Sequence, residues 1–238
     1  MSFAAGVLGG MVGLVLGSLR LPALLVASGN PAAAAGTNIA VSAAAAASAG
    51  LAHVRGRRVD WQTVAWMTPP SVAAAFLGGY FGGSVSDRLL LAGIAAVLAW
   101  NGVDILLELR PGTGRARSPH AAAAVSGAFI GLVGGAVGLI LGTLRLPALL
   151  RFVGLSAHRA VGTNLIVGFF LGASGFLGHL ARLEVEWLVL AVSLVGAVPG
   201  GWLGARLTGK LSETTLRRAI GLVLLAVAVA IGVEAGAA

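Results

Sequence analysis

The sequence predicts an all-α polytopic membrane protein built from two homologous repeats of four segments each. Composition points to the membrane, because 58% of the 238 residues are hydrophobic, only 10% are charged and the mean hydropathy is +0.96. Soluble domains carry about 25% charged residues. Apolar stretches of about 20 residues, the length that crosses a bilayer as a helix, recur along the whole chain. One such stretch could be a buried core helix, but eight in succession indicate a membrane protein.

An internal duplication predicts two copies of one unit. Residues 17–25 return almost unchanged as residues 142–150, a shift of 125, and residues 36–38 return as 162–164, a shift of 126. The shift of 126 also pairs His53 with His179, Asp60 with Glu186 and Glu108 with Glu234. We therefore divide the chain into repeat 1 (residues 1–110), a cytoplasmic linker (111–125) and repeat 2 (126–238).

Each repeat contains four hydrophobic segments that we expect to be helices. In repeat 1 they lie near residues 3–28, 32–52, 62–83 and 89–108, and in repeat 2 near 121–154, 160–180, 187–207 and 214–234. The first segment of each repeat contains residues that break helices, Gly17 and Pro22 in repeat 1 and Gly142 and Pro147 in repeat 2. The linker is rich in Arg, Pro and Gly, as suits a surface connection.

The 16 Lys and Arg residues bear on the topology. If all eight segments cross, the loops place seven of them on one side and nine on the other, without the bias that the positive-inside rule predicts. If each first segment is a re-entrant hairpin with its tip at Arg20 or Arg145, each repeat crosses three times and repeat 2 is inverted. Twelve cations then face the cytoplasm, two face outward and two lie at the tips. We therefore predict inverted repeats with both termini outside, and leave the shape of the first segment, broken or re-entrant, open.

Arg20 and Arg145 are the first candidates for a substrate site. An arginine within an apolar segment costs about 2.5–3.5 kcal/mol on insertion scales and usually faces a cavity or a partner. A broken helix exposes backbone N–H groups, and a short helix beginning at Pro22 would point its positive end inward. A guanidinium beside a helix N-terminus suits an anion, because it offers two parallel donors to an oxyanion. The alternative is that each arginine reaches an interface or bonds to backbone carbonyls.

Hydroxyl and amide groups near the breaks can donate to an anion without adding charge. These candidates are Ser18, Thr143, Thr37, Asn38, Thr163 and Asn164. Their alternative role is a helix cap or an interhelical hydrogen bond. His53, His179 and Glu108, together with Asp104, are candidates for proton coupling, with interfacial placement as the alternative for the two histidines.

Glycines follow the same duplication in the first segments. They are Gly6, Gly9, Gly10, Gly13 and Gly17 in repeat 1, and Gly131, Gly134, Gly135, Gly138 and Gly142 in repeat 2. Small residues at a spacing of four allow helix backbones to approach closely, so we expect these glycines to lie at helix–helix contacts.

Other chemistries are disfavoured. Cysteine is absent, which excludes disulfides and thiolate metal sites, and no catalytic motif occurs. We expect no enzyme activity, no metal and no cofactor. The net charge of +8 would suit nucleic acid, but arginines in the short loops of a membrane protein indicate topology instead. The expected partners are the lipid bilayer and a small inorganic or organic anion, and a homodimer is left open.

The chain resembles the TauE/SafE family of sulfite-exporter-like permeases along essentially its whole length. The resemblance rests on the doubled pattern of a Gly-rich helix, a break, Pro-Ala-Leu-Leu and an Ala-rich helix opening with Gly-Thr. It implies a multi-pass permease of the prokaryotic plasma (inner) membrane that moves sulfite, a sulfonate or a related sulfur oxyanion. From the two arginines at the breaks we expect Arg20 and Arg145 to approach each other near the midplane, between the repeats, and to hold one anion together. The sequence departs from the family at the break, where Gly17-Ser18-Leu19-Arg20 replaces a run of three glycines. An anion channel and a non-transporting assembly protein are the alternatives.

Overall fold

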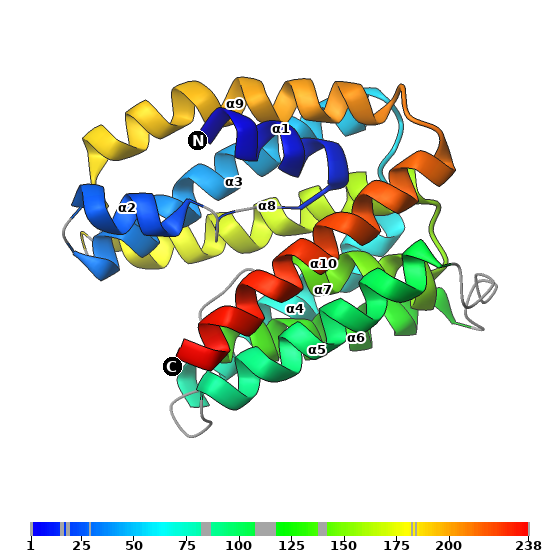
Figure 1. Cartoon of the computed structure of the whole chain (residues 1–238), viewed down its shortest axis with the longest axis horizontal. Coiled ribbons are helices and arrows are strands. Elements are labelled where there is room, and N and C mark those ends of the chain that lie inside the picture. Colours follow the sequence, from blue (N-terminus) through cyan, green and yellow to red (C-terminus); the bar gives the residue numbers. More distant parts are fainter. Residues whose placement is uncertain are drawn as a thin grey trace. The chain divides into compact units, whose positions relative to one another are not determined.

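The computed structural model describes residues 2–14, 17, 20–28, 30–81, 87–107, 118–137, 142–181, 183 and 185–237. Every regular element of these residues is a helix, so the all-α prediction is confirmed (Figure 1). The chain divides into two compact units. Unit 1 contains Met1–Asp60 and Val161–Lys210, and unit 2 contains Trp61–Ala160 and Leu211–Ala238. Each unit therefore takes helices from both predicted repeats.

Unit 1 is built around helices that pack backbone to backbone. Its helices are α1 (Ser2–Val12), α2 (Leu21–Ser28), α3 (Pro31–Arg55), most of α8 (Ala157–Ala181) and α9 (Trp187–Thr208). A Cβ atom added to Gly6 of α1 would lie 2.8 Å from the carbonyl oxygen of Ala197 on α9, and Gly10 packs equally closely on Gly201. The expected helix–helix role is thus confirmed for these two glycines, whose missing side chains allow α1 and α9 to touch.

The helices of unit 1 run in defined directions. Both ends of α3 meet the matching ends of α9, because the N–H of Glu186 donates to Thr37 Oγ1 and Gly209 lies against the Arg58 guanidinium. These two helices are therefore parallel. Helix α8 is antiparallel to α3, since Ile166, near its start, contacts Gly50, near the end of α3, and contacts between the two helices then run in opposite order along their chains.

Unit 2 uses the same kind of packing. Its helices are α4 (Trp61–Phe81), α5 (Asp87–Leu106), α6 (Pro119–Val137), α7 (Gly142–Ala148), the π-helix η2 (Leu149–Val153) and α10 (Glu213–Ala237). Helix α4 packs on α6, where Gly131 lies against the backbone of Ser71. Helix α5 packs on α10 through two facing glycines, since a Cβ atom on Gly102 or Gly221 would lie 3.1 Å from the other's carbonyl oxygen.

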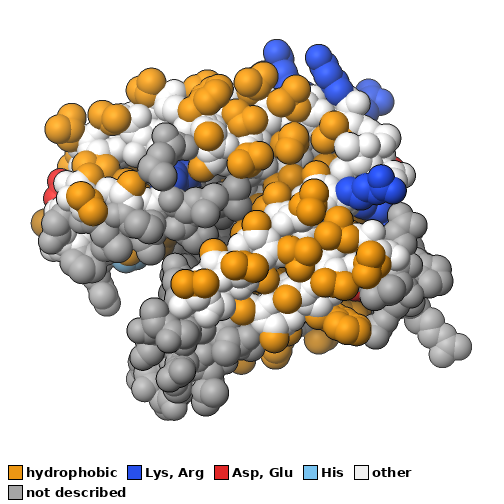
Figure 2. All heavy atoms as spheres, viewed as in Figure 1, with side chains coloured by type: hydrophobic (Ala, Val, Ile, Leu, Met, Phe, Trp, Pro, Cys, Tyr) orange, Lys and Arg blue, Asp and Glu red, His pale blue; other side chains and the backbone are white. Residues whose placement is uncertain are grey.

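Four helices are long and apolar enough to cross a membrane within the described part of the chain. These spans are Ala33–Arg55, Ala157–Ala181, Trp187–Thr208 and Glu213–Val233. Figure 2 shows hydrophobic side chains covering the visible faces of α9 and α10. On α9 they include Leu188 and Val195, which are 78% and 77% exposed. Aliphatic side chains left this open along a whole helix suit lipid rather than water.

The first segments break at positions that differ from the prediction. In repeat 1, helix α1 ends at Val12 and Gly13 adopts a left-handed φ of +75°, so α1 ends eight residues before the predicted tip at Arg20. Pro22 is the second residue of α2, as expected for a proline in a first turn. In repeat 2, α6 ends at Val137 and Gly142 begins α7, with Pro147 inside that helix. Proline removes a helical hydrogen bond there, and the chain continues as a π-helix.

Candidate anion site

The end of α1 is fixed by side chains from three other helices. The last carbonyls of a helix lack partners within it. Asn164 Nδ2 donates to the carbonyl of Gly13 at 2.7 Å, and Thr208 Oγ1 donates to that of Met11 at 2.7 Å. His53 Nε2 lies 3.4 Å from the carbonyl oxygen of Gly10, and because a carbonyl only accepts, Nε2 carries the hydrogen. The predicted substrate residue Asn164 therefore holds the helix end.

His53 is fully buried near the end of α3, where its imidazole satisfies the carbonyl of Gly10 at the end of α1. Its interfacial placement in the membrane stays a prediction. His179 lies half-buried near the end of α8. Glu108 and Ser18 lie outside the described residues. Proton coupling through His53, His179 or Glu108 stays a prediction, as does substrate binding by Ser18.

Arg20 lies at the centre of a polar group in unit 1. Its side chain is only 3% exposed, and Nη2 donates to Ser42 Oγ at 2.8 Å. Ser42 stands near the middle of α3, a candidate membrane span, so the guanidinium lies at mid-depth along that helix. The backbone at residue 17 comes close to Ser42 and Asn38, and only glycine fits there. A Cβ atom on Gly17 would lie 2.9 Å from Ser42 Oγ and 3.0 Å from Asn38 Nδ2. Arg20, Asn38 and Ser42 thus meet around Gly17.

This polar group has unused hydrogen-bonding capacity. Arg20 Nε and Asn38 Oδ1 are buried and make no hydrogen bond to the described residues, where Arg20 also has no carboxylate partner. A small cavity of about 10 Å³, roughly room for one water, borders Arg20. It is lined by Ala5, Gly6, Gly9, Gly10, Leu14, Ala45, Ala46 and Leu165. A buried donor without a partner is costly, and an anion oxygen would satisfy it.

Arg145 occupies the matching position in repeat 2 but lies in unit 2. It belongs to α7 and is 2% exposed. The residue that corresponds to Ser42 at the shift of 126 is Gly168, so repeat 2 offers no equivalent hydroxyl. The predicted approach of Arg20 and Arg145 to each other stays a prediction. Thr143 lies half-buried near the start of α7.

Thr37 and Thr163 hold helix starts. Both are fully buried. Thr37 Oγ1 accepts the N–H of Glu186, the N-cap of α9, at 2.9 Å, and Thr163 Oγ1 accepts the N–H of Asp60, just before α4, also at 2.9 Å. Each of these hydrogen bonds caps a helix start from another helix and joins residues from both predicted repeats. Anion binding by the two threonines stays a prediction.

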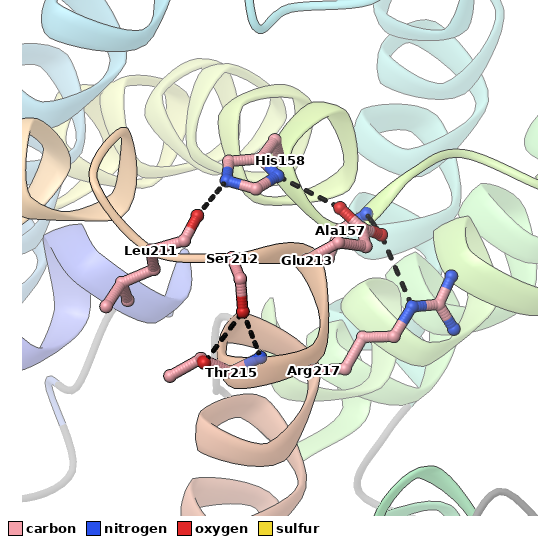
Figure 3. Close-up of polar contacts among 7 residues, drawn as sticks. All are labelled: Ala157, His158, Leu211, Ser212, Glu213, Thr215 and Arg217. Atoms are coloured by element: carbon pink, nitrogen blue, oxygen red, sulfur yellow. Dashed lines mark hydrogen bonds and ion pairs between the residues drawn. The ribbon is translucent and has the colours of Figure 1, made fainter.

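Two polar clusters in unit 2 were not predicted. Asp104 of α5, 1% exposed, forms an ion pair with Arg151 of η2. Figure 3 shows the second cluster, in which His158 bridges the Leu211 carbonyl (3.1 Å from Nε2) and the Glu213 carboxylate (2.9 Å from Nδ1). Glu213 also accepts the N–H of Ala157 at 2.6 Å, so this cluster ties the start of α8 to the start of α10. Pairing between distant elements carries no local sequence signal. Among the described residues, no group of three His, Cys, Asp or Glu side chains could hold a metal.

Comparison with known proteins decides the family. The sequence profile described as "Sulfite exporter TauE/SafE" matches residues 1–231, nearly the whole chain. The chain belongs to the TauE/SafE family. It is a multi-pass bacterial membrane protein of a transporter family, as the resemblance implied.

Three curated relatives are named probable membrane transporter proteins, and the chain covers most of the length of two of them. The chain is 31% identical to a probable membrane transporter protein of Xylella fastidiosa (strain 9a5c), over 93% of this chain and 91% of the relative. It is 25% identical to the probable membrane transporter protein YunE of Bacillus subtilis (strain 168), over the same shares. The probable membrane transporter protein MamO of Paramagnetospirillum magneticum is 27% identical over 96% of this chain but only 43% of the relative. No solved structure gives a significant match.

Proposed function

We propose that this TauE/SafE protein is a secondary transporter for a small anion, and that its substrate is sulfite, a sulfonate or a related sulfur oxyanion. The observation that carries the proposal is Arg20, a guanidinium buried beside the middle of a candidate span and bonded to a neutral hydroxyl. An uncompensated charge in the membrane is expensive and usually marks a substrate path. The family description supports sulfur oxyanions as the class.

The residues around Arg20 suit an oxyanion. Arg20 Nε supplies a charged donor that no described residue uses, Asn38 supplies an amide and Ser42 a hydroxyl. Within unit 1, Asn38 and Ser42 add neutral groups beside the single charge of Arg20, which suits an anion that must be released again after binding. Arg145, buried in α7, is proposed as the second anion-binding residue.

Inverted repeats with broken first segments are part of the proposal. Helices α3 and α8, which correspond in sequence, are antiparallel, as inversion requires. The caps Thr37–Glu186 and Thr163–Asp60 exchange with each other under the shift of 126, as a two-fold relation requires. Reporter fusions at Gly56 and at the C-terminus should lie on opposite sides of the membrane. A result on the same side would rule out inversion.

The binding site is tested with purified protein and a series of anions. Sulfite, sulfate, thiosulfate and simple sulfonates are screened for thermal stabilisation in detergent and for uptake into proteoliposomes. Arg20→Gln should weaken binding at least tenfold, because a hydrogen bond to a charged group contributes about 1.5–3 kcal/mol. Arg20→Lys should retain only part of the anion affinity, because lysine keeps the charge but cannot donate two parallel hydrogen bonds. Arg218→Gln, which removes an exposed arginine of unit 2, is the control. A folded Arg20→Gln protein with wild-type affinity for every transported anion would remove Arg20 from the site.

A further inference from the structure

One end of unit 1 gathers cations. Helices α3 and α9 end side by side here, and the residues concerned are Arg55, Arg57, Arg58, Arg206 and Lys210. All but Arg58 are exposed, while the acidic residue of this end in the described chain, Asp60, is buried. Figure 2 shows Lys and Arg side chains projecting beyond the apolar surface at this end of α9. The end therefore presents a positive surface with no exposed carboxylate among the described residues.

Two of these arginines are held on a single indole. The Arg55 Cζ atom lies 4.9 Å from the centre of the Trp202 ring, and the Arg206 Cζ atom lies 5.2 Å from it. Both distances fall within the range of a cation–π interaction, about 6 Å. Arg206 stands one helical turn after Trp202 on α9, whereas Arg55 is the last residue of α3. Two like charges thus share one aromatic ring, and an anion that contacts both guanidinium groups would offset their repulsion.

A third cation of this cluster, Arg58, also has a guanidinium group that an anion would stabilise. Arg58 lies against Gly56 and Gly209, and its Nη1 atom is buried without a hydrogen bond to any described residue. Desolvation by burial lowers the pKa of its guanidinium from the ordinary value. A nearby anion would offset that loss of solvation.

The position of this cation cluster, at the ends of two candidate membrane spans, indicates which anion it binds. Both α3 and α9 are candidate membrane spans, and the cluster lies where they end together. Tryptophan is enriched at this level of the bilayer, where lipid headgroups lie. Guanidinium groups bind phosphate through two parallel hydrogen bonds. The positive-inside rule accounts for cations in such a loop in general, but it does not require two of them to stack on one ring.

We propose that Arg55, Arg206 and Trp202 bind the phosphate of an anionic phospholipid headgroup, with Arg57, Arg58 and Lys210 adding attraction. This end is the one that the charge distribution predicts to face the cytoplasm, where anionic lipids are concentrated. The site is separate from the proposed transport site. Arg55 lies 13 residues beyond Ser42 on α3, roughly 20 Å along the helix.

The test measures lipid binding by the whole chain in neutral detergent. Phosphatidylglycerol and phosphatidylcholine are titrated separately, with native mass spectrometry for bound lipid and melting temperature as a second readout. Wild-type protein should bind phosphatidylglycerol preferentially. The double variant Arg55→Gln/Arg206→Gln should bind it at least tenfold more weakly, because each cation near the surface contributes to attraction of anionic lipid. Trp202→Leu keeps all the cations but should still weaken phosphatidylglycerol binding, because Arg55 and Arg206 lose the aromatic ring on which they stack.

Matched variants make the result specific. Arg159→Gln/Arg218→Gln removes two exposed arginines from unit 2 and should leave lipid binding unchanged. Arg55→Lys/Arg206→Lys keeps the charge and should retain only part of the affinity, because the planar fork is lost. The proposal is overturned if the Gln pair binds phosphatidylglycerol as wild type does, or if the unit 2 control loses as much. It is also overturned if inorganic phosphate alone gives the full thermal shift, since the site would then bind a free anion.

Discussion

Arg20 in unit 1 and Arg151 in unit 2 meet two different polar environments. Arg20 is almost fully buried and its described partner is the neutral hydroxyl of Ser42, whereas Arg151 pairs with the carboxylate of Asp104. Neither pair is repeated: the shift that relates the two halves places Gly168 opposite Ser42, Ala230 opposite Asp104 and Val26 opposite Arg151. A neutralised charge can join two elements permanently. A charge left without a counter-ion is suited to receive one from a ligand.

Breaking the ion pair of unit 2 should have the largest effect on stability. Arg151→Gln leaves the Asp104 carboxylate, which is 1% exposed, without its cation. Removing one partner of a buried pair costs about 3–5 kcal/mol. We expect a large fall in melting temperature in detergent. The double variant Arg151→Gln/Asp104→Asn should recover most of it, because no charge remains buried. If the single variant melts like wild type, the pair does not hold η2 to α5.

The second test compares the glycine contacts of the two units. Gly6 on Ala197 joins α1 to α9, and Gly131 on Ser71 joins α6 to α4. These contacts occupy positions related by the shifts of 125 and 126. Gly6→Ala and Gly131→Ala should each destabilise by about 1–3 kcal/mol, because the new methyl groups meet backbone that cannot move aside easily.

Gly232→Ala is the matched control for these glycines. A Cβ atom at Gly232 meets nothing closer than 3.9 Å, so alanine should stabilise α10 slightly through its higher helix propensity. Thermal melting of all three variants measures the contrast. Equal behaviour of Gly6→Ala and Gly232→Ala would show that α1 does not need its close approach to α9.

These contacts also show what the sequence could predict. The glycine spacing and the apolar segments are local patterns, and they correctly predict close helix contacts and an all-helical chain. Arg20 could be singled out because an arginine in an apolar segment is costly wherever it points. Ser42 was missed although it stands one turn after Asn38, on the same face of α3. The partner of Asp104 could not be predicted, because it depends on how α5 meets η2.

The positions of the helix breaks also depend partly on local sequence and partly on contacts with distant residues. Gly17, Pro22, Gly142 and Pro147 are all residues typical of a helix break. Helix α1 nevertheless ends at Val12, and Asn164 donates a hydrogen bond to the carbonyl of the next residue, Gly13. Which glycine becomes the turn depends on what lies beside it. At Gly13 the backbone of Val161 leaves no room for a Cβ atom, and this contact comes from the other half of the chain.

The paired threonine caps should have smaller and equal effects. Thr37→Val and Thr163→Val each remove the acceptor for one N–H, the partly buried one of Glu186 or the buried one of Asp60. Loss of a cap costs about 0.5–2 kcal/mol. Thr214→Val, at an exposed position of α10, is the control. Equal losses at the two caps, measured by thermal melting, would support a two-fold relation. A loss at only one of them would contradict it.

The smallest effect on folding is expected at Arg20, and this sharpens the contrast with Arg151. Arg20→Met replaces a buried cation, which has no carboxylate partner among the described residues, by an apolar side chain of similar length. Because the wild-type charge is desolvated without full compensation, we expect the melting temperature without anion to stay the same or rise. Ser42 loses its donor but can bond to the carbonyl four residues earlier on its own helix. The same variant should lose the stabilisation that wild-type protein gains from the transported anion, measured by melting with and without it. A fall as large as that of Arg151→Gln would show that Arg20 is a structural residue, and the difference between the two arginines would disappear.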